Sequence, residues 1–184
     1  MKATGIVRRI DDLGRVVIPK EIRRTMRIRE GDPLEIYTDR EGEVIFKKYS
    51  PIGELTGFAA QYCETLSKIC DMSVVITDRD SVIASSGVPK KEFADRAVSS
   101  RAEEIMEARS TFCIGENERA FECCADGSGT YVVSCMAPII AEGDIIGSVA
   151  SLVPASDASS HRVSDTENKL IRTAAGFLGR QLEG

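Results

Sequence analysis

The chain has 184 residues, 42% of them hydrophobic and 29% charged, a balance typical of a folded globular protein that excludes a disordered chain. No apolar run approaches the roughly 20 residues that cross a bilayer, and the N-terminal MKATGIVRRIDDLG lacks the apolar core of a signal peptide, so we expect a cytoplasmic protein without a membrane partner. The net charge of −5 is unevenly distributed. Residues 1–50 are basic, with 12 Lys/Arg and 9 Asp/Glu, and residues 51–184 are acidic, with 12 Lys/Arg and 20 Asp/Glu. This asymmetry indicates two units with different partners.

The first 50 residues predict two hairpins and a short helix. The β-branched runs GIVRRI and RVVI lie on either side of the turn-forming cluster Asp11–Gly14, which predicts the first hairpin. Pro19 stands where a first helical turn tolerates proline, so PKEIRRTM is expected to form about two turns of helix. The runs LEIYT and EVIFKK flank Asp39–Gly42 and predict the second hairpin.

A unit of this size can bury only a small core. Residues 1–50 contain no cysteine, so disulfides cannot compensate for the small core. We therefore expect this unit to dimerise, each chain completing the core of the other.

The predicted helix carries a basic stripe. Four basic residues follow the i, i+3, i+4, i+7 spacing that places them on one helix face: Lys20, Arg23, Arg24 and Arg27. Like charges at i and i+4 cost a few tenths of a kcal/mol, and only Glu21 intervenes, off the stripe. The first hairpin adds Arg8, Arg9 and Arg15, although alternation leaves open which of the first two points outward.

Nucleic acid is the partner that this basic surface favours. The planar fork of arginine grips phosphate or reads guanine edges, and a dimer doubles the set of such groups. We therefore expect double-stranded DNA as the partner, and a merely solvated basic face is the alternative.

The remaining chain predicts an α+β domain. Ser50-Pro51 marks a break between predicted elements, and an amphipathic helix is expected over 54–70. The runs SVVIT and SVIAS are predicted strands on either side of the turn at 78–80. One helix is expected from Lys90 to Arg109, and FECC, YVVSCMAPII and DIIGSVASLV are strand candidates, the last two joined at 141–143. Ser164 and Glu167 form a capping box before a terminal helix over 165–182. Strands bracketed by helices indicate an α+β fold.

The cysteines and the single histidine give weak evidence for a site. The six cysteines are Cys63, Cys70, Cys113, Cys123, Cys124 and Cys135. We expect reduced, buried residues, and the alternative is a redox sensor in which Arg119 would stabilise a thiolate. No CxxC pair exists and His161 has no companion at ligand spacing, so no metal site is expected.

Residues 1–50, with the core string LGRVVIPKEIRR, resemble the AbrB-type swapped-hairpin DNA-binding domain of bacterial transition-state regulators. The resemblance implies a β-rich, β-barrel-like dimer in which two chains interleave their hairpins. The family's DNA-contacting arginines match Arg8, Arg15, Arg23 and Arg24. Arg9, Lys20 and Arg27 fall outside that contact set and are left as phosphate contacts or plain surface.

Residues 51–184 resemble a GAF domain through APIIAEGDIIGSVASLV, with Pro138 in one strand and Ile146-Gly147 in the next, and through the helices at both ends. The resemblance implies an α+β fold with a central antiparallel sheet and flanking helices, serving as a small-molecule sensor or an oligomerisation module. It carries over no cofactor and names no ligand. The helices over 54–70 and 165–182 could pair with those of another chain, which would join two dimers into a tetramer.

The pairing of both domains resembles sporulation regulators and implies a transcription regulator in the developing spore that activates some promoters and represses others. One alternative is an antitoxin, since several antitoxins share the swapped hairpin, but these usually continue into a disordered acidic tail. The other is an enzyme, because some GAF domains reduce methionine sulfoxide with cysteines. No general base is evident here, so we expect no catalytic residues.

Overall fold

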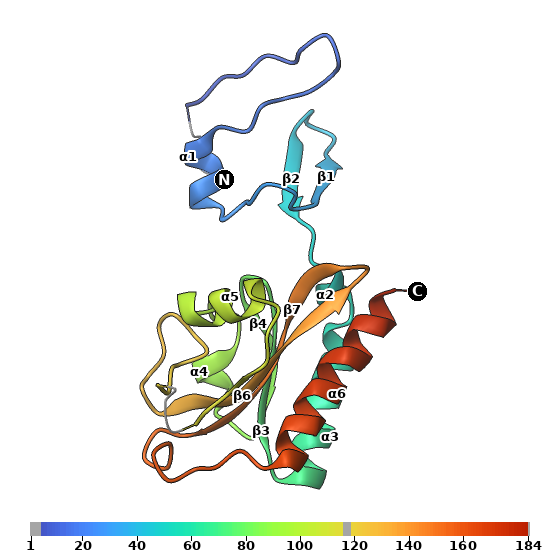
Figure 1. The fold of residues 1–184 in the computed structure, drawn as a ribbon. Coiled ribbons are helices and arrows are strands. Elements are labelled where there is room, and N and C mark those ends of the chain that lie inside the picture. The colour runs from blue at the N-terminus through green and yellow to red at the C-terminus, as the bar shows by residue number, and fades with distance from the viewer. Residues whose placement is uncertain (1–4, 116–118, 184) are drawn as a thin grey trace. The chain divides into compact units, whose positions relative to one another are not determined.

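The computed structural model describes residues 5–115 and 119–183 and divides into two compact units, Met1–Tyr49 (unit 1) and Ser50–Gly184 (unit 2). Figure 1 shows the elements of each unit. Among the described residues, no helix has both the length and the apolar character needed to span a membrane.

Unit 1 contains the predicted second hairpin. Strands β1 (Leu34–Thr38) and β2 (Val44–Lys48) pair antiparallel, with Ile36 opposite Phe46. The turn between them is built on Asp39, whose Oδ1 accepts hydrogen bonds from the backbone N–H groups of Glu41 and Glu43, both at 2.9 Å. An aspartate that bonds the backbone two residues ahead is a usual device for such a turn.

The first hairpin is not formed as a ladder within one chain, so this prediction is wrong for the single chain. Only its turn is present: the N–H of Asp11 donates to the carbonyl of Arg15, and that of Gly14 to the carbonyl of Asp11, both at 3.0 Å. The flanking runs have no strand structure, and their apolar side chains are exposed, Val7 by 86% and Val17 by 71%. A two-stranded hairpin needs further strands or a packed face to be stable, and one chain supplies neither here.

The predicted basic helix is α1 (Lys20–Thr25), shorter than expected. It ends because Arg27 adopts a left-handed conformation with φ of 51°, and the N–H of Ile28 returns to the carbonyl of Arg23 at 2.7 Å. Lys48 of β2 holds this end in place, since its Nζ donates to the carbonyl of Arg27 at 2.7 Å and lies 3.5 Å from the buried carboxylate of Asp32.

Unit 2 is built on a five-stranded antiparallel sheet in the order β4-β3-β7-β6-β5. Its strands are β3 (Ser73–Asp78), β4 (Val82–Ser86), β5 (Phe112–Cys113), β6 (Tyr131–Ala141) and β7 (Asp144–Pro154). A tight turn with Gly143 at φ of 86° joins the two long strands β6 and β7. The strand predictions SVVIT, SVIAS, YVVSCMAPII and DIIGSVASLV are therefore confirmed.

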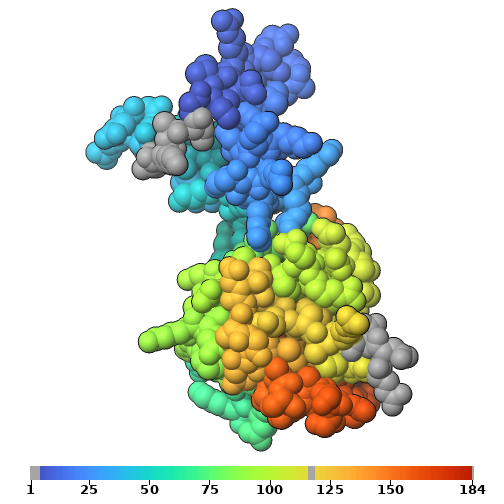
Figure 2. All heavy atoms as spheres, turned by 90° about the vertical axis from the view of Figure 1, so that its left-hand side faces the viewer, coloured from blue at the N-terminus to red at the C-terminus, as the bar shows by residue number. Residues whose placement is uncertain are grey.

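Helices cover both faces of this sheet (Figure 1). One face packs on α2 (Pro51–Glu54), α3 (Thr56–Cys70) and α6 (Asp165–Leu182), and this core includes Ile76, Ile139, Ile171 and Leu178. The other face packs on α4 (Lys90–Phe93) and α5 (Ser100–Glu107). Figure 2 views unit 2 from that second side, where segments from the middle of the chain, green to yellow, close over the sheet.

Two predictions for unit 2 are wrong. The single helix expected over 90–109 is divided into α4 and α5, because Asp95 takes a left-handed φ of 56° and Ser99 starts a new helix by accepting from the Ala102 N–H at 3.3 Å. The strand expected at FECC is reduced to one bridge between Cys124 and Val98. The outer strand of the sheet is instead β5.

Candidate functional site

The four arginines that the sequence predicts as DNA contacts are exposed, as a nucleic-acid interface requires. Arg23 and Arg24 lie side by side in sequence on α1, which has no buried residue, and Arg8 is exposed on the loop before the turn. These three arginines form no ion pair within the part of the chain that the structure describes. Their guanidinium groups are therefore available to a ligand.

Arg15 differs from these three because it is bound to the turn. Its backbone N–H and its Nε both reach the carboxylate of Asp11, at 2.7 and 2.8 Å, and the N–H of Leu13 adds a third hydrogen bond at 3.0 Å. The backbone hydrogen bond from Arg15, followed by that from its guanidinium group, holds the pKa of Asp11 below its usual value. The Arg15 side chain is still 69% exposed, so it is oriented by this pair without being covered.

The structure groups the predicted contact residues only in part. Arg23 and Arg24 share α1, whereas Arg8 and Arg15 lie on the two arms of the first loop. The predicted four-residue stripe is wrong in its last member, because Arg27 lies beyond the end of α1.

Unit 1 has almost no core of its own. Among its described residues only Pro19 is buried. The large apolar side chains that are exposed are Ile6, Val7, Ile10, Leu13, Val16, Val17, Met26, Ile36, Tyr37, Val44, Phe46 and Tyr49. An apolar surface of this extent in so small a unit marks an interface with another chain.

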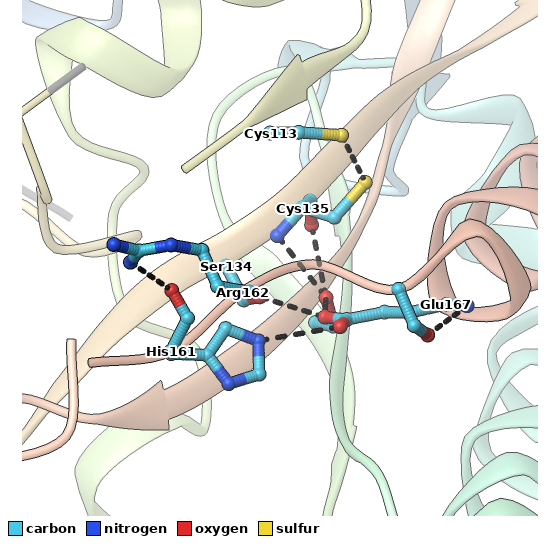
Figure 3. Close-up of polar contacts among 8 residues, drawn as sticks. Cys113, Ser134, Cys135, His161, Arg162 and Glu167 are labelled. Atoms are coloured by element: carbon cyan, nitrogen blue, oxygen red, sulfur yellow. Dashed lines mark hydrogen bonds and ion pairs between the residues drawn. The ribbon is translucent and has the colours of Figure 1, made fainter. Parts of the chain in front are cut away.

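A second polar constellation lies in unit 2 around Glu167 (Figure 3). The Oε1 atom accepts hydrogen bonds from the hydroxyls of Ser134 on β6 and Ser151 on β7, both at 2.7 Å. Its Oε2 lies 3.3 Å from Nε2 of His161, and the Glu167 side chain is only 13% exposed. We call these four residues the Glu167 cluster.

Sequence reasoning assigned Glu167 a different role. The Ser164 hydroxyl caps α6 as predicted, accepting from the Glu167 N–H at 3.0 Å. The carboxylate does not complete the capping box, and it turns to the two serines of the sheet instead. Its partners lie up to 33 residues away in sequence, so no local pattern could have identified the cluster.

The cysteines are all free, and none belongs to a metal cluster among the residues that the structure describes. Burial raises the pKa of the Cys63 thiol to about 12 and also raises that of Cys135, whose Sγ lies 3.1 Å from that of Cys113. The pKa of Cys124 is lowered by a hydrogen bond from Cys123 and then by the charge of Arg96. The arginine whose charge acts on this thiol is Arg96, whereas the redox-sensor alternative named Arg119.

Two family patterns match the chain. The family described as stage V sporulation protein T C-terminal, transcription factor, matches residues 54–183. The family described as antidote-toxin recognition MazE, bacterial antitoxin, matches residues 7–53.

Similar proteins cover the whole chain or one of its units. Stage V sporulation protein T of Bacillus subtilis (strain 168) is 49% identical over 185 residues, which are 100% of this chain and 99% of that protein. The transition state regulatory protein AbrB of the same organism is 44% identical over 87 residues, 47% of this chain and 81% of the relative. Among solved structures, the GAF domain of a phosphoenolpyruvate-protein phosphotransferase from Coxiella burnetii covers 70% of this chain and 82% of its own, at 15% identity and a TM-score of 0.51. This last likeness shows a GAF-like fold.

Proposed function

The chain belongs to the stage V sporulation protein T family of transcription factors, and from this premise we propose how it binds DNA. It is a DNA-binding transcription regulator of sporulation with an AbrB-type N-terminal domain and a GAF-like domain. Two copies of unit 1 interleave into one dimer, and Arg8, Arg15, Arg23 and Arg24 of each copy contact double-stranded DNA. As a regulator of transcription it acts in the cytoplasm, activating some promoters and repressing others.

The observation that carries this proposal is the state of unit 1 in a single chain. Its apolar side chains are exposed, and so are the four arginines of the proposed contact set: Arg8, Arg23 and Arg24 form no ion pair within the described residues, and Arg15 is held in a pair that leaves it 69% exposed. Burying apolar surface is worth roughly 25 cal/mol per Å², so a second chain that covers these residues supplies the missing core. The same association doubles the number of arginines on one rigid body.

The resemblance of residues 7–53 to an antitoxin family does not favour toxin binding. An antitoxin usually follows this domain with a disordered tail that wraps its toxin. Here Ser50–Gly184 forms a compact unit with a packed core on each face of its sheet. A folded domain in that place fits the role of sensing or oligomerisation that we assign to unit 2.

We assign no catalytic role to unit 2. The Glu167 cluster combines serine, histidine and a carboxylate, but the Ser134 and Ser151 side chains are 0% and 2% exposed. Both hydroxyls donate to Glu167 and could not reach a substrate carbonyl. The cluster acts by binding and positioning.

The salt dependence of DNA affinity tests the interface. Four arginines on each of two chains would neutralise about eight phosphates, so log K should fall against log salt with a slope of roughly −7. The measurement is fluorescence anisotropy with the full chain and a duplex selected by genome-wide crosslinking, over a series of KCl concentrations. Arg8→Ala, Arg23→Ala and Arg24→Ala should each weaken binding and flatten the slope by about 2 in a dimer.

Arg40→Ala is the matched control, because Arg40 is also exposed in unit 1 but lies in the β1–β2 turn outside the proposed contacts. It should leave the slope nearly unchanged. Binding that does not depend on salt, or equal losses from Arg40→Ala and Arg23→Ala, would reject the assignment.

A further inference from the structure

A cleft of about 520 Å³ lies in unit 2 next to the Glu167 cluster. It is bounded by the C-terminal end of α3, the start of β3, the end of β7 and the first turn of α6. This volume is within the range of small-molecule sites. By contrast, the hollow between Phe93 and Tyr131 on the other side of the sheet holds about 10 Å³, roughly the room of one water.

A β-bulge brings the polar groups of the cleft together. In the β6–β7 ladder Val133 pairs with Leu152 and Cys135 pairs with Ser151, so Ser134 is an extra residue without a partner. Bulges re-aim side chains, and here the bulge lets the Ser134 hydroxyl reach Glu167 on α6 together with Ser151. The Ser151 hydroxyl also accepts the N–H of Cys135 at 3.1 Å.

The Glu167 carboxylate is held more closely at one oxygen than at the other (Figure 3). Two serine hydroxyls at 2.7 Å bind Oε1. Oε2 makes a longer contact of 3.3 Å with His161, whose side chain is 27% exposed. Both Glu167 and His161 line the cleft. Oε2 therefore has capacity for a further, better donor.

The charge of the cleft is negative. Its lining contains the carboxylates of Asp71 and Glu167 but no lysine or arginine among the described residues. The α3 helix ends at Cys70, with Asp71 as its C-cap, and a helix C-terminus carries partial negative charge. The remaining wall is largely apolar, including Met72, Leu152 and Leu170.

We propose that this cleft binds a small organic cation. Its ammonium group donates to Oε2 of Glu167 and is further attracted by Asp71, while its aliphatic or aromatic body packs against the apolar wall. The His161 ring contacts the same oxygen in this structure and is displaced by the ligand. This inference goes beyond the proposed function and concerns unit 2 alone, so it does not depend on DNA binding.

The simpler account is that Glu167 only fastens α6 to the sheet. In that case the carboxylate would matter for stability, but the cleft would show no preference for positive charge. A series of probes of similar shape, one cationic, one neutral and one anionic, separates the two accounts. Suitable probes are 2-phenylethylammonium, the neutral 2-phenylethanol and the anion 3-phenylpropanoate.

Isothermal titration calorimetry with the full chain, without DNA, measures each probe. We expect the cation to bind at least 10-fold more tightly than the alcohol and the anion to bind more weakly still. Equal affinity for the three probes, or no binding of the cation, would overturn the proposal. Neither result would bear on DNA affinity, which is measured separately.

Substitutions in the lining of the cleft test whether the cation binds there. Glu167→Gln should reduce cation affinity to that of the alcohol. Asp71→Asn should reduce cation affinity about 3-fold, as expected of a partly screened charge. Asparagine suits the left-handed backbone conformation at position 71. Glu107→Gln, at an exposed position on α5, is the control and should change nothing.

His161→Ala distinguishes a ligand-binding role of the Glu167 carboxylate from a purely structural role. Removing the ring frees Oε2, so cation affinity should be unchanged or should rise several-fold. A loss of cation affinity in this variant would contradict the displacement of His161. If Glu167→Gln fails to fold by circular dichroism, Asp71→Asn and His161→Ala decide the question.

Discussion

Asp11 fixes the direction of Arg15, a basic side chain that we propose contacts DNA. Its carboxylate accepts two backbone N–H groups and the Arg15 guanidinium. The resulting turn holds Arg15 in one direction while leaving the side chain largely open. If Arg15 contacts DNA as proposed, Asp11 supports binding through geometry, although its charge repels phosphate.

Asp11→Ala and Asp12→Ala together separate the orientation of Arg15 from the effect of charge. Both changes remove one negative charge from the same exposed turn, so charge alone would predict tighter DNA binding for each. We expect Asp12→Ala to bind slightly more tightly and Asp11→Ala to bind several-fold more weakly, because Arg15 loses its orientation. Anisotropy at fixed salt measures both affinities. Tighter binding by Asp11→Ala would show that the turn does not orient Arg15.

The same turn has a defined pH dependence. Because the pKa of Asp11 is lowered in the folded chain, the carboxylate form stabilises the turn. That contribution is fully present above the unfolded value of 3.8 and is lost as the pH falls through the lower folded pKa. Between pH 5 and 8 the turn should therefore not change.

At the scale of elements, α6 lies unusually close to the sheet. A Cβ on Gly179 would collide with the carbonyl oxygen of Ile140 on β6, whereas a Cβ on Gly176 would meet nothing within 4 Å. Both glycines belong to α6. The helix therefore needs glycine at one of these positions and tolerates a larger residue at the other.

Two substitutions on this one helix test the close approach. Gly176→Ala should stabilise unit 2 by about 0.5–1 kcal/mol, the usual gain in helix propensity. Gly179→Ala should instead destabilise it by about 1–3 kcal/mol, because the backbone of β6 must move. Urea unfolding followed by circular dichroism at one protein concentration gives both values. Equal stabilisation by the two changes would mean that α6 and β6 are not in contact at Gly179.

Elements with local signals were predictable, and those that depend on distant partners were not. The Ser164 cap and the apolar stripe defined α6, and the turn at Asp39 defined the second hairpin. The helix expected over 90–109 is divided because Val98 and Ala97 bridge to residues far away in sequence, which periodicity does not show. The Glu167 cluster was missed for the same reason, since it depends on a bulge at Ser134. The ladder of the first hairpin is absent because its apolar side chains find no packed face within one chain.

At the scale of the whole molecule, we propose that two separate interfaces determine assembly. The exposed apolar residues of unit 1 favour a dimer, and unit 2 presents a second surface on α3 and α6. There Phe58, Tyr62 and Phe177 stack with ring centroids 5.8 to 6.2 Å apart. Phe58 and Phe177 are 36% and 40% exposed. We propose that this aromatic cluster packs on the same cluster of a second copy, which joins two dimers into a tetramer.

The aromatic cluster can be tested without disturbing the dimer of unit 1. Phe177→Glu places a charge within the proposed contact, and burying an unpaired charge costs far more than the aromatic contact contributes, so the tetramer should separate into dimers. Sedimentation equilibrium of the full chain measures the mass. Arg172→Glu, at an exposed position about 140° around the same helix, is the control and should leave the tetramer intact.

The Phe177→Glu dimer should keep the salt slope of DNA binding for one duplex site, because that slope comes from unit 1. A variant that sediments as a monomer would show instead that unit 2 holds the whole assembly together, and that the exposed apolar residues of unit 1 do not suffice for dimerisation.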